Sequence, residues 1–133
     1  MSEGPRREAR ERALSLLYEA EAKDLAPGVL LEELPLAPEP FAGDLVVGVG
    51  KHQAVIDELI SRYSIDWALE RMPAVDRNLL RMAVYELLER PEVPVAAVIS
   101  EAVELAKRYS TDESGRFVNG VLSSIAFEVR PEG

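Results

Sequence analysis

The hydrophobic pattern of residues 94–122 constrains the fold of this chain more than any other feature of the sequence. Pro94 suits the first position of a helix, where its missing backbone N–H costs nothing. The apolar residues that follow recur at the three- and four-residue steps of an α-helix: Val95, Val98, Ile99, Ala102, Val103, Leu105, Ala106 and Tyr109. A polar segment then interrupts the pattern, with Thr111 or Ser114 as the N-cap of a second helix. Two core helices joined by a short polar loop are therefore predicted, the second with an apolar stripe of Phe117, Val118, Val121, Leu122 and Ile125.

Helical patterns also dominate the rest of the chain, which predicts an all-α fold. Helices are expected over residues 5–23, around 29–34, over 41–63 and over 73–89, with a short turn or helix at 64–72. Residues 73–89 are apolar on most sides, which is typical of a central, buried helix. Glu86 falls within that apolar surface, so we expect it to pair with Arg90 or with an arginine from another helix. Gly48 and Gly50 weaken the helix over 41–63 and indicate a close helix crossing there.

Length and composition fit one globular domain over residues 1–133. The chain is 47% hydrophobic and 29% charged, which is an ordinary mixture for a soluble protein. No apolar run is long enough to span a bilayer, and the arginine-rich start lacks the apolar core of a secretory signal. Cysteine is absent, which excludes disulfides and thiolate metal sites. We therefore expect a cytoplasmic protein without a membrane role.

The sequence contains no constellation that would carry catalysis. It lacks a glycine-rich phosphate loop, a pair of histidines at metal-binding spacing and a nucleophile elbow. His52 is the single histidine and lies among apolar residues, so it is interpreted as a packed or boundary residue. Glu86 has no second carboxylate marked out as its partner and is interpreted as structural. The prediction is a protein that is not an enzyme, with no catalytic residue, no metal and no cofactor.

The charge balance limits the ways in which this chain could bind nucleic acid. The net charge is −9, from 15 basic and 24 acidic residues. An acidic surface repels phosphate, so any RNA would have to bind at a local basic patch. The acidic remainder would suit a basic protein partner.

One candidate basic patch lies at the start of the first predicted helix. Arg6, Arg7 and Arg10 can share one broad sector of that helix with Tyr18. Cations beside an exposed ring would suit a single RNA strand, with charge for the phosphates and a ring for a base. Arg6 and Arg10 continue the apolar stripe, which predicts that the helix projects past the core, because a buried unpaired guanidinium is costly. The alternative is a solvated helix end whose arginines pair locally with neighbouring glutamates.

Four sequence blocks, in this order, resemble the NusB family of bacterial transcription antitermination factors. They are R-R-E-A-R-E-R-A-L-S-L-L-Y at 6–18, V-D-R-N-L-L-R-M-A-V-Y-E-L-L at 75–88, P-V-A-A-V-I-S-E-A-V-E-L-A-K at 94–107 and R-F-V-N-G-V-L at 116–122. The resemblance implies two small helical bundles packed together.

The resemblance also implies a function and partners. Members of this family bind the boxA element of ribosomal RNA leaders jointly with NusE, a basic protein of the small ribosomal subunit. They do so within an antitermination complex on RNA polymerase, which promotes processive transcription of ribosomal RNA. A basic partner would account for the acidic balance of this chain. The alternative is a helical module that binds only protein, or a homo-oligomer such as a homodimer, with its arginines as ordinary surface residues.

The resemblance also implies which residues form the site, because positions of this sequence can be matched to the motifs of the family. Arg6, Arg7 and Arg10 match the family's basic RNA-contacting segment, and Tyr18 matches an aromatic residue of its RNA site. Tyr109 matches an aromatic residue near RNA, although the helical period places it on the apolar stripe. Glu113 falls at an acidic loop position beside the RNA surface, and Lys107, Arg108 and Arg116 are further candidates nearby. For the acidic face that receives the protein partner, the candidates are Asp76, Glu101 and Glu104.

Overall fold

Seven α-helices and one short 3₁₀ turn make up the part of the chain described by a computed structural model, residues 3–133. The elements are α1 (Glu3–Ala22), α2 (Pro27–Glu33), α3 (Pro40–Lys51), α4 (Gln53–Tyr63), the turn η1 (Leu69–Arg71), α5 (Ala74–Glu89), α6 (Val95–Tyr109) and α7 (Asp112–Val129). The predicted all-α fold is confirmed. Within residues 3–133, no helix combines the length and the apolar character that crossing a bilayer requires.

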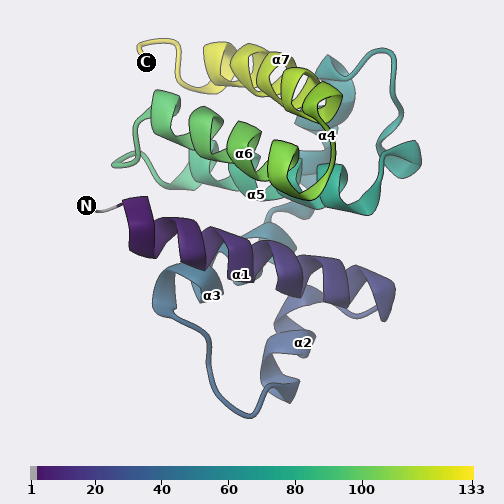
Figure 1. The fold of residues 1–133 in the computed structure, drawn as a ribbon, viewed down its shortest axis with the longest axis vertical. Helices are drawn as coiled ribbons and strands as arrows, with labels where there is room; N and C mark the ends of the chain where they lie inside the picture. Colours follow the sequence, from purple (N-terminus) through teal and green to yellow (C-terminus); the bar gives the residue numbers. More distant parts are fainter. Residues whose placement is uncertain (1–2) are drawn as a thin grey trace.

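The helices form two groups that meet at α5. Helices α1, α2 and α3 lie together in one half of the molecule, and α4 to α7 make up the other half (Figure 1). Helix α5 contacts α1, α3, α4, α6 and α7, so it is the central element. Leu79, Leu80 and Val84 on this helix are completely buried. The pattern that is apolar on most sides therefore correctly predicted the central helix.

The prediction of one helix over residues 41–63 is wrong, because the chain breaks at His52. This residue has φ −111° and ψ 18°, and it separates α3 from α4. The break lets α3 pack on α1 and α2, while α4 packs on α5 and α7. The predicted close crossing at Gly48 is confirmed, since a Cβ atom at this position would lie 2.2 Å from ring carbons of Tyr85. His52 also stacks on Tyr85, with 5.9 Å between the ring centroids, and is a packed boundary residue.

The polar loop between α6 and α7 is short and its cap is Thr111. The Thr111 side-chain oxygen accepts a hydrogen bond from the backbone N–H of Ser114 at 2.9 Å. The Ser114 hydroxyl in turn donates to the carboxylate of Asp76 on α5 at 2.6 Å. At the far end of α7, the guanidinium of Arg130 donates to the backbone carbonyls of Glu86, Leu87, Arg90 and Val93, at distances from 2.6 to 2.9 Å. These bonds attach the end of α7 to the end of α5 and to the turn that follows it, in addition to the backbone hydrogen bonds that the carbonyls of Glu86 and Arg90 already accept.

Candidate nucleic-acid interface

Arg10 lies in the core, so the prediction that it projects past the core is wrong. Only 3% of Arg10 is exposed, and its guanidinium donates two hydrogen bonds of 2.8 Å to the carboxylate of Glu86, which is 1% exposed. The physical reason is that Glu86, in the middle of the apolar surface of α5, needs a counter-charge, and α1 packs there. Glu86 therefore pairs with an arginine from another helix, whereas Arg90 binds Asp44 and Glu92.

The other two arginines at the start of α1 also interact with side chains of other helices. Arg7 donates to both carboxylate oxygens of Glu101 on α6, at 2.9 and 2.7 Å. These hydrogen bonds hold the pKa of Glu101 below its usual range. Arg6 lies over the ring of Phe41 on α3, 4.4 Å from its centroid. The three arginines and Tyr18 therefore do not form one exposed cationic sector, because one arginine is buried and another contacts α3.

A different surface, which we call the α1–α6 face, brings several of the predicted residues together. Helices α1 and α6 lie next to each other in Figure 1. Side chains bridge them: Arg7, near the start of α1, bonds Glu101 in the middle of α6, and Glu11 bonds two residues near the end of α6. The Glu11 Oε2 atom accepts from Arg108 Nη1 at 2.5 Å and from the Tyr109 hydroxyl at 3.0 Å.

Between the two helices lies a hollow of about 430 Å³, which we call the tyrosine pocket. It is lined by Glu11, Leu14, Ser15, Tyr18, Val75 and Tyr109. Tyr18 is 47% exposed and Tyr109 is 49% exposed, although both belong to helices that pack in the core. Tyr109 escapes burial because it is the last residue of α6, where the apolar stripe runs past the core. The pocket is therefore mainly apolar, with two accessible rings and one carboxylate at its edge.

Exposed cations lie at the end of α6 and the start of α7, and one of them, Arg108, binds Glu11 at the edge of this pocket. Lys107 and Arg108 belong to the last turn of the helix, and both are exposed. Arg116 and Glu113, exposed at the start of α7, line a neighbouring hollow that also contains Trp67. Among the described side chains, neither Lys107 nor Arg116 forms an ion pair, whereas Arg108 is bound to Glu11. The structure thus brings Arg108 and Tyr109 together with Tyr18 through Glu11 and the tyrosine pocket, whereas the Lys107 side chain lies beside Gly115 of α7.

Two of the three acidic positions expected to receive a protein partner are buried. Asp76 is completely buried in the first turn of α5, where it accepts the hydrogen bond of Ser114. Glu101 is 4% exposed and pairs with Arg7. Neither carboxylate offers an accessible charge, so their assignment to an exposed acidic face is wrong. Glu104 is exposed on α6, and its role remains a prediction.

Glu11 belongs to the site but was not predicted from the sequence. There it is only one of the glutamates that neighbour the arginines of the first predicted helix and offset their charge. The available signal is spacing, because residues three to four positions apart lie on one face of a helix. Glu11, Leu14, Ser15 and Tyr18 follow that spacing, and all four line the tyrosine pocket.

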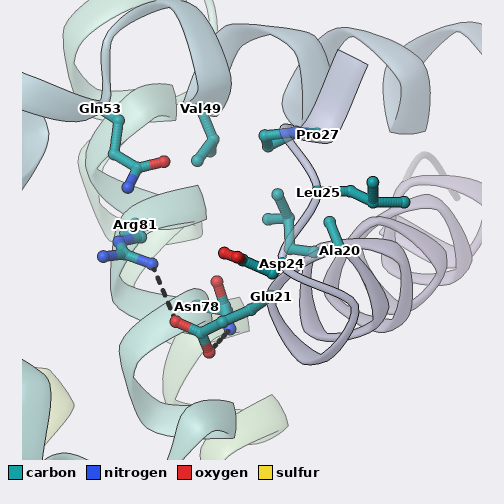
Figure 2. Close-up of a pocket in the computed structure, with 10 residues that line it drawn as sticks. Ala20, Glu21, Asp24, Leu25, Pro27, Val49, Gln53, Asn78 and Arg81 are labelled. Carbon is teal, nitrogen blue, oxygen red and sulfur yellow. Dashed lines mark hydrogen bonds and ion pairs between the residues drawn. The ribbon is translucent and has the colours of Figure 1, made fainter. Parts of the chain in front are cut away.

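A second hollow, of about 240 Å³, lies where α1 meets α5 near the start of α2. Figure 2 shows Asn78 and Arg81 of α5 beside it, with Glu21 of α1 between them. Glu21 accepts hydrogen bonds from Arg77, Asn78 and Arg81, and the bonds from Arg77 are the main reason that its pKa lies below the usual range. These groups mostly satisfy one another, so they hold α1 on α5. The described residues contain no group of three or more His, Asp or Glu residues able to hold a metal ion.

Comparisons with known proteins agree with this fold and its motifs. Residues 7–127 match the sequence profile of the NusB family. The chain is 50% identical over 125 residues to the transcription antitermination protein NusB of Kineococcus radiotolerans, covering 91% of this chain and 92% of that protein. Its structure is similar to that of T. maritima NusB, with a TM-score of 0.81, 41% identity and coverage of 93% and 92% of the two chains.

A second solved structure is also similar over almost the whole chain. It is a crystal structure of the antitermination factors NusB and NusE in complex with dsRNA, with a TM-score of 0.79 and 32% identity. The alignment covers 92% of this chain and 96% of the other. With a family profile that spans most of the sequence and relatives at this level of identity, this chain belongs to the NusB family.

Proposed function

We propose that this chain is a bacterial transcription antitermination factor that binds RNA on its α1–α6 face, jointly with NusE. Membership of the NusB family supports the antitermination role. The similar structure that contains NusB, NusE and dsRNA supports the two partners. The observation that carries the location is the tyrosine pocket, where two half-exposed rings lie beside Glu11 and its ion-pair partner Arg108.

Each kind of side chain on this face has a distinct role in the proposal. The rings of Tyr18 and Tyr109 stack on unpaired bases, since every base offers a π-face to an aromatic side chain. Lys107 and Arg108 contact phosphates at the end of α6, and Arg6 and Arg7 do so at the start of α1. Arg10 acts indirectly, because its buried pair with Glu86 fixes α1 against α5. Arg116 and Glu113 border the RNA where α7 begins.

The net charge of the chain and its membership of the NusB family support a basic protein partner and a role in transcription. The net charge of −9 favours association with a basic protein such as NusE, and Glu104 is an accessible acid for that contact. The whole chain then acts as one unit that delivers RNA to the antitermination complex on RNA polymerase. It acts without catalysis or cofactor, in the bacterial cytoplasm, where transcription takes place.

Replacing the two tyrosines tests the proposal. Tyr18→Ala and Tyr109→Ala should each weaken binding of a ribosomal leader RNA by about 1–3 kcal/mol, the usual contribution of one stacked base. Affinity would be measured by gel shift with wild-type and variant proteins, in the presence and absence of NusE. Phe127→Ala is the matched control, because Phe127 is an exposed ring on α7, 79% accessible, outside the tyrosine pocket.

Two results would contradict the proposal. Unchanged RNA affinity in both tyrosine variants would remove the tyrosine pocket from the RNA site. Binding to NusE, or self-association, with no binding to RNA under any condition would instead identify a protein-interaction module.

A further inference from the structure

The carboxylate of Glu11 is the one charged group that lines the tyrosine pocket, and neither stacking nor phosphate binding uses it. A negative charge at this place opposes the binding of an RNA backbone. Its Oε2 atom accepts from Arg108 and Tyr109, which fixes the carboxylate against the pocket. Among the described residues, no donor bonds the Oε1 atom. Arg108 and Tyr109 use the two lone-pair positions of Oε2, so the two positions of Oε1 remain available to accept hydrogen bonds.

We infer that the tyrosine pocket holds one unstacked base of the RNA strand and that Glu11 selects guanine at this position. This inference rests on the proposed function and adds a base preference to it. Sequence-specific recognition of RNA commonly uses unstacked bases that stack on aromatic rings and form hydrogen bonds along their Watson–Crick edges. The pocket has both elements, with rings from Tyr18 and Tyr109 and a carboxylate from Glu11.

The chemistry of the four base edges identifies guanine. A carboxylate only accepts hydrogen bonds, and the free Oε1 atom of Glu11 can accept from two N–H donors that lie side by side. Guanine offers such a pair, N1–H and the N2 amino group, on its Watson–Crick edge. Adenine and cytosine each place an acceptor nitrogen beside their amino group, and uracil places a carbonyl on each side of its single N–H. Both arrangements repel a carboxylate, and uracil should fit worst.

The surroundings of Glu11 make this contact feasible. Leu14, which is 5% exposed, and Val75 line the pocket, so the base would replace water on an apolar surface. Arg108 stays bonded to Glu11 and, together with Lys107, offsets the repulsion between the carboxylate and the RNA phosphates. The pocket volume of about 430 Å³ leaves room for a purine beside both rings.

The test uses the full chain together with NusE and a set of short single-stranded RNAs. The reference is a uridine-only oligomer, compared with the same oligomer carrying a single guanosine, adenosine or cytidine at its centre. The expected result for the wild type is tightest binding to the guanosine oligomer, by about tenfold over the uridine reference, the size of one good contact to a base edge. Glu11→Gln should lose most of this preference, because an amide offers one acceptor and adds a donor.

Glu8→Gln is the control, since Glu8 is an exposed glutamate on the same helix and the change in charge is identical. It should keep the guanosine preference. A wild type that binds all oligomers equally would overturn this inference and leave the proposed function standing. Tighter binding of every oligomer by Glu11→Gln, with the base preference unchanged, would also overturn it, because Glu11 would then only mask Arg108. No binding of any RNA would overturn both the inference and the proposed function.

Discussion

Ion pairs cover the α1–α6 face beside the start of α1, a region that we call the start of the face. At its far end, beside the end of α6, two aromatic rings are exposed around a pocket. Near the start, Arg10 is buried against Glu86, and Arg7 is bonded to Glu101. Near the end, Tyr18 and Tyr109 are about half exposed around a mainly apolar pocket. Helix α1 thus contributes both to a rigid attachment, mainly to α5, and to an accessible site beside α6.

The difference shows that the type of a residue does not decide its role. An arginine opposite a buried carboxylate becomes part of the core, because the ion pair avoids the cost of an isolated charge. A tyrosine at the last position of a helix stays accessible, because the apolar stripe extends past the core there. We therefore expect replacement of the buried Arg10 to change stability alone, and substitutions at the far end of this face to change RNA binding.

The largest effect is expected from Arg10→Ala. This change leaves Glu86 buried without its counter-charge, which costs about 3–5 kcal/mol of unfolding free energy. Urea unfolding followed by circular dichroism measures the change. In the double variant Arg10→Met with Glu86→Leu, most of the stability should return, since apolar side chains of similar volume can replace a buried ion pair. A loss below about 1 kcal/mol for Arg10→Ala would show that this end is not a rigid attachment.

Local patterns in the sequence predicted most of the fold. Helices α6 and α7 pack through their apolar stripes, and α5 packs through apolar residues on most of its sides. The periodicity of these residues therefore identified the core. The break at His52 could not be predicted in this way, because the residues on both sides continue one helical pattern. It depends on Tyr85, which occupies the space beside Gly48 and stacks on His52.

The candidate site was less predictable, because it depends on which charges meet in space. Arg10 and Glu86 are 76 positions apart, and Arg7 and Glu101 are 94 positions apart. No local pattern indicates that these residues pair. The four family motifs named the correct helices, but only the packing of α1 against α5 separates the buried arginine from the accessible ones. Glu11 was missed for the same reason, since its partners Arg108 and Tyr109 lie on α6.

A smaller effect, dependent on pH, is expected for Arg7→Ala. Arg7 lowers the folded-state pKa of Glu101, so this contact stabilises the fold above the unfolded pKa of about 4.3. Its contribution is lost as the pH falls through the lower, folded-state pKa. The variant should therefore be less stable than the wild type near neutral pH, and the gap should close in strong acid.

Urea midpoints measured from neutral to strongly acidic pH would test this expectation. Arg12→Ala is the control, because Arg12 is an exposed arginine on the same helix and has no ion pair among the described side chains. Its midpoint should follow that of the wild type at every pH. A gap between Arg7→Ala and the wild type that does not change with pH would mean that ionisation of Glu101 is not the cause.

The smallest effect is expected from Lys107→Gln, and it should appear only in RNA binding. Lys107 is exposed and has no acidic partner among the described side chains, so its loss should leave the urea midpoint unchanged. Loss of one phosphate contact should flatten the slope of log affinity against log salt by about 0.7, the value for a single strand. Arg108→Gln should flatten the slope equally but also releases Glu11 from its ion pair, so the two variants differ in affinity and not in slope. Equal slopes for Lys107→Gln and the wild type would place the RNA phosphates away from the end of α6, and would remove the contrast between the two ends of this face.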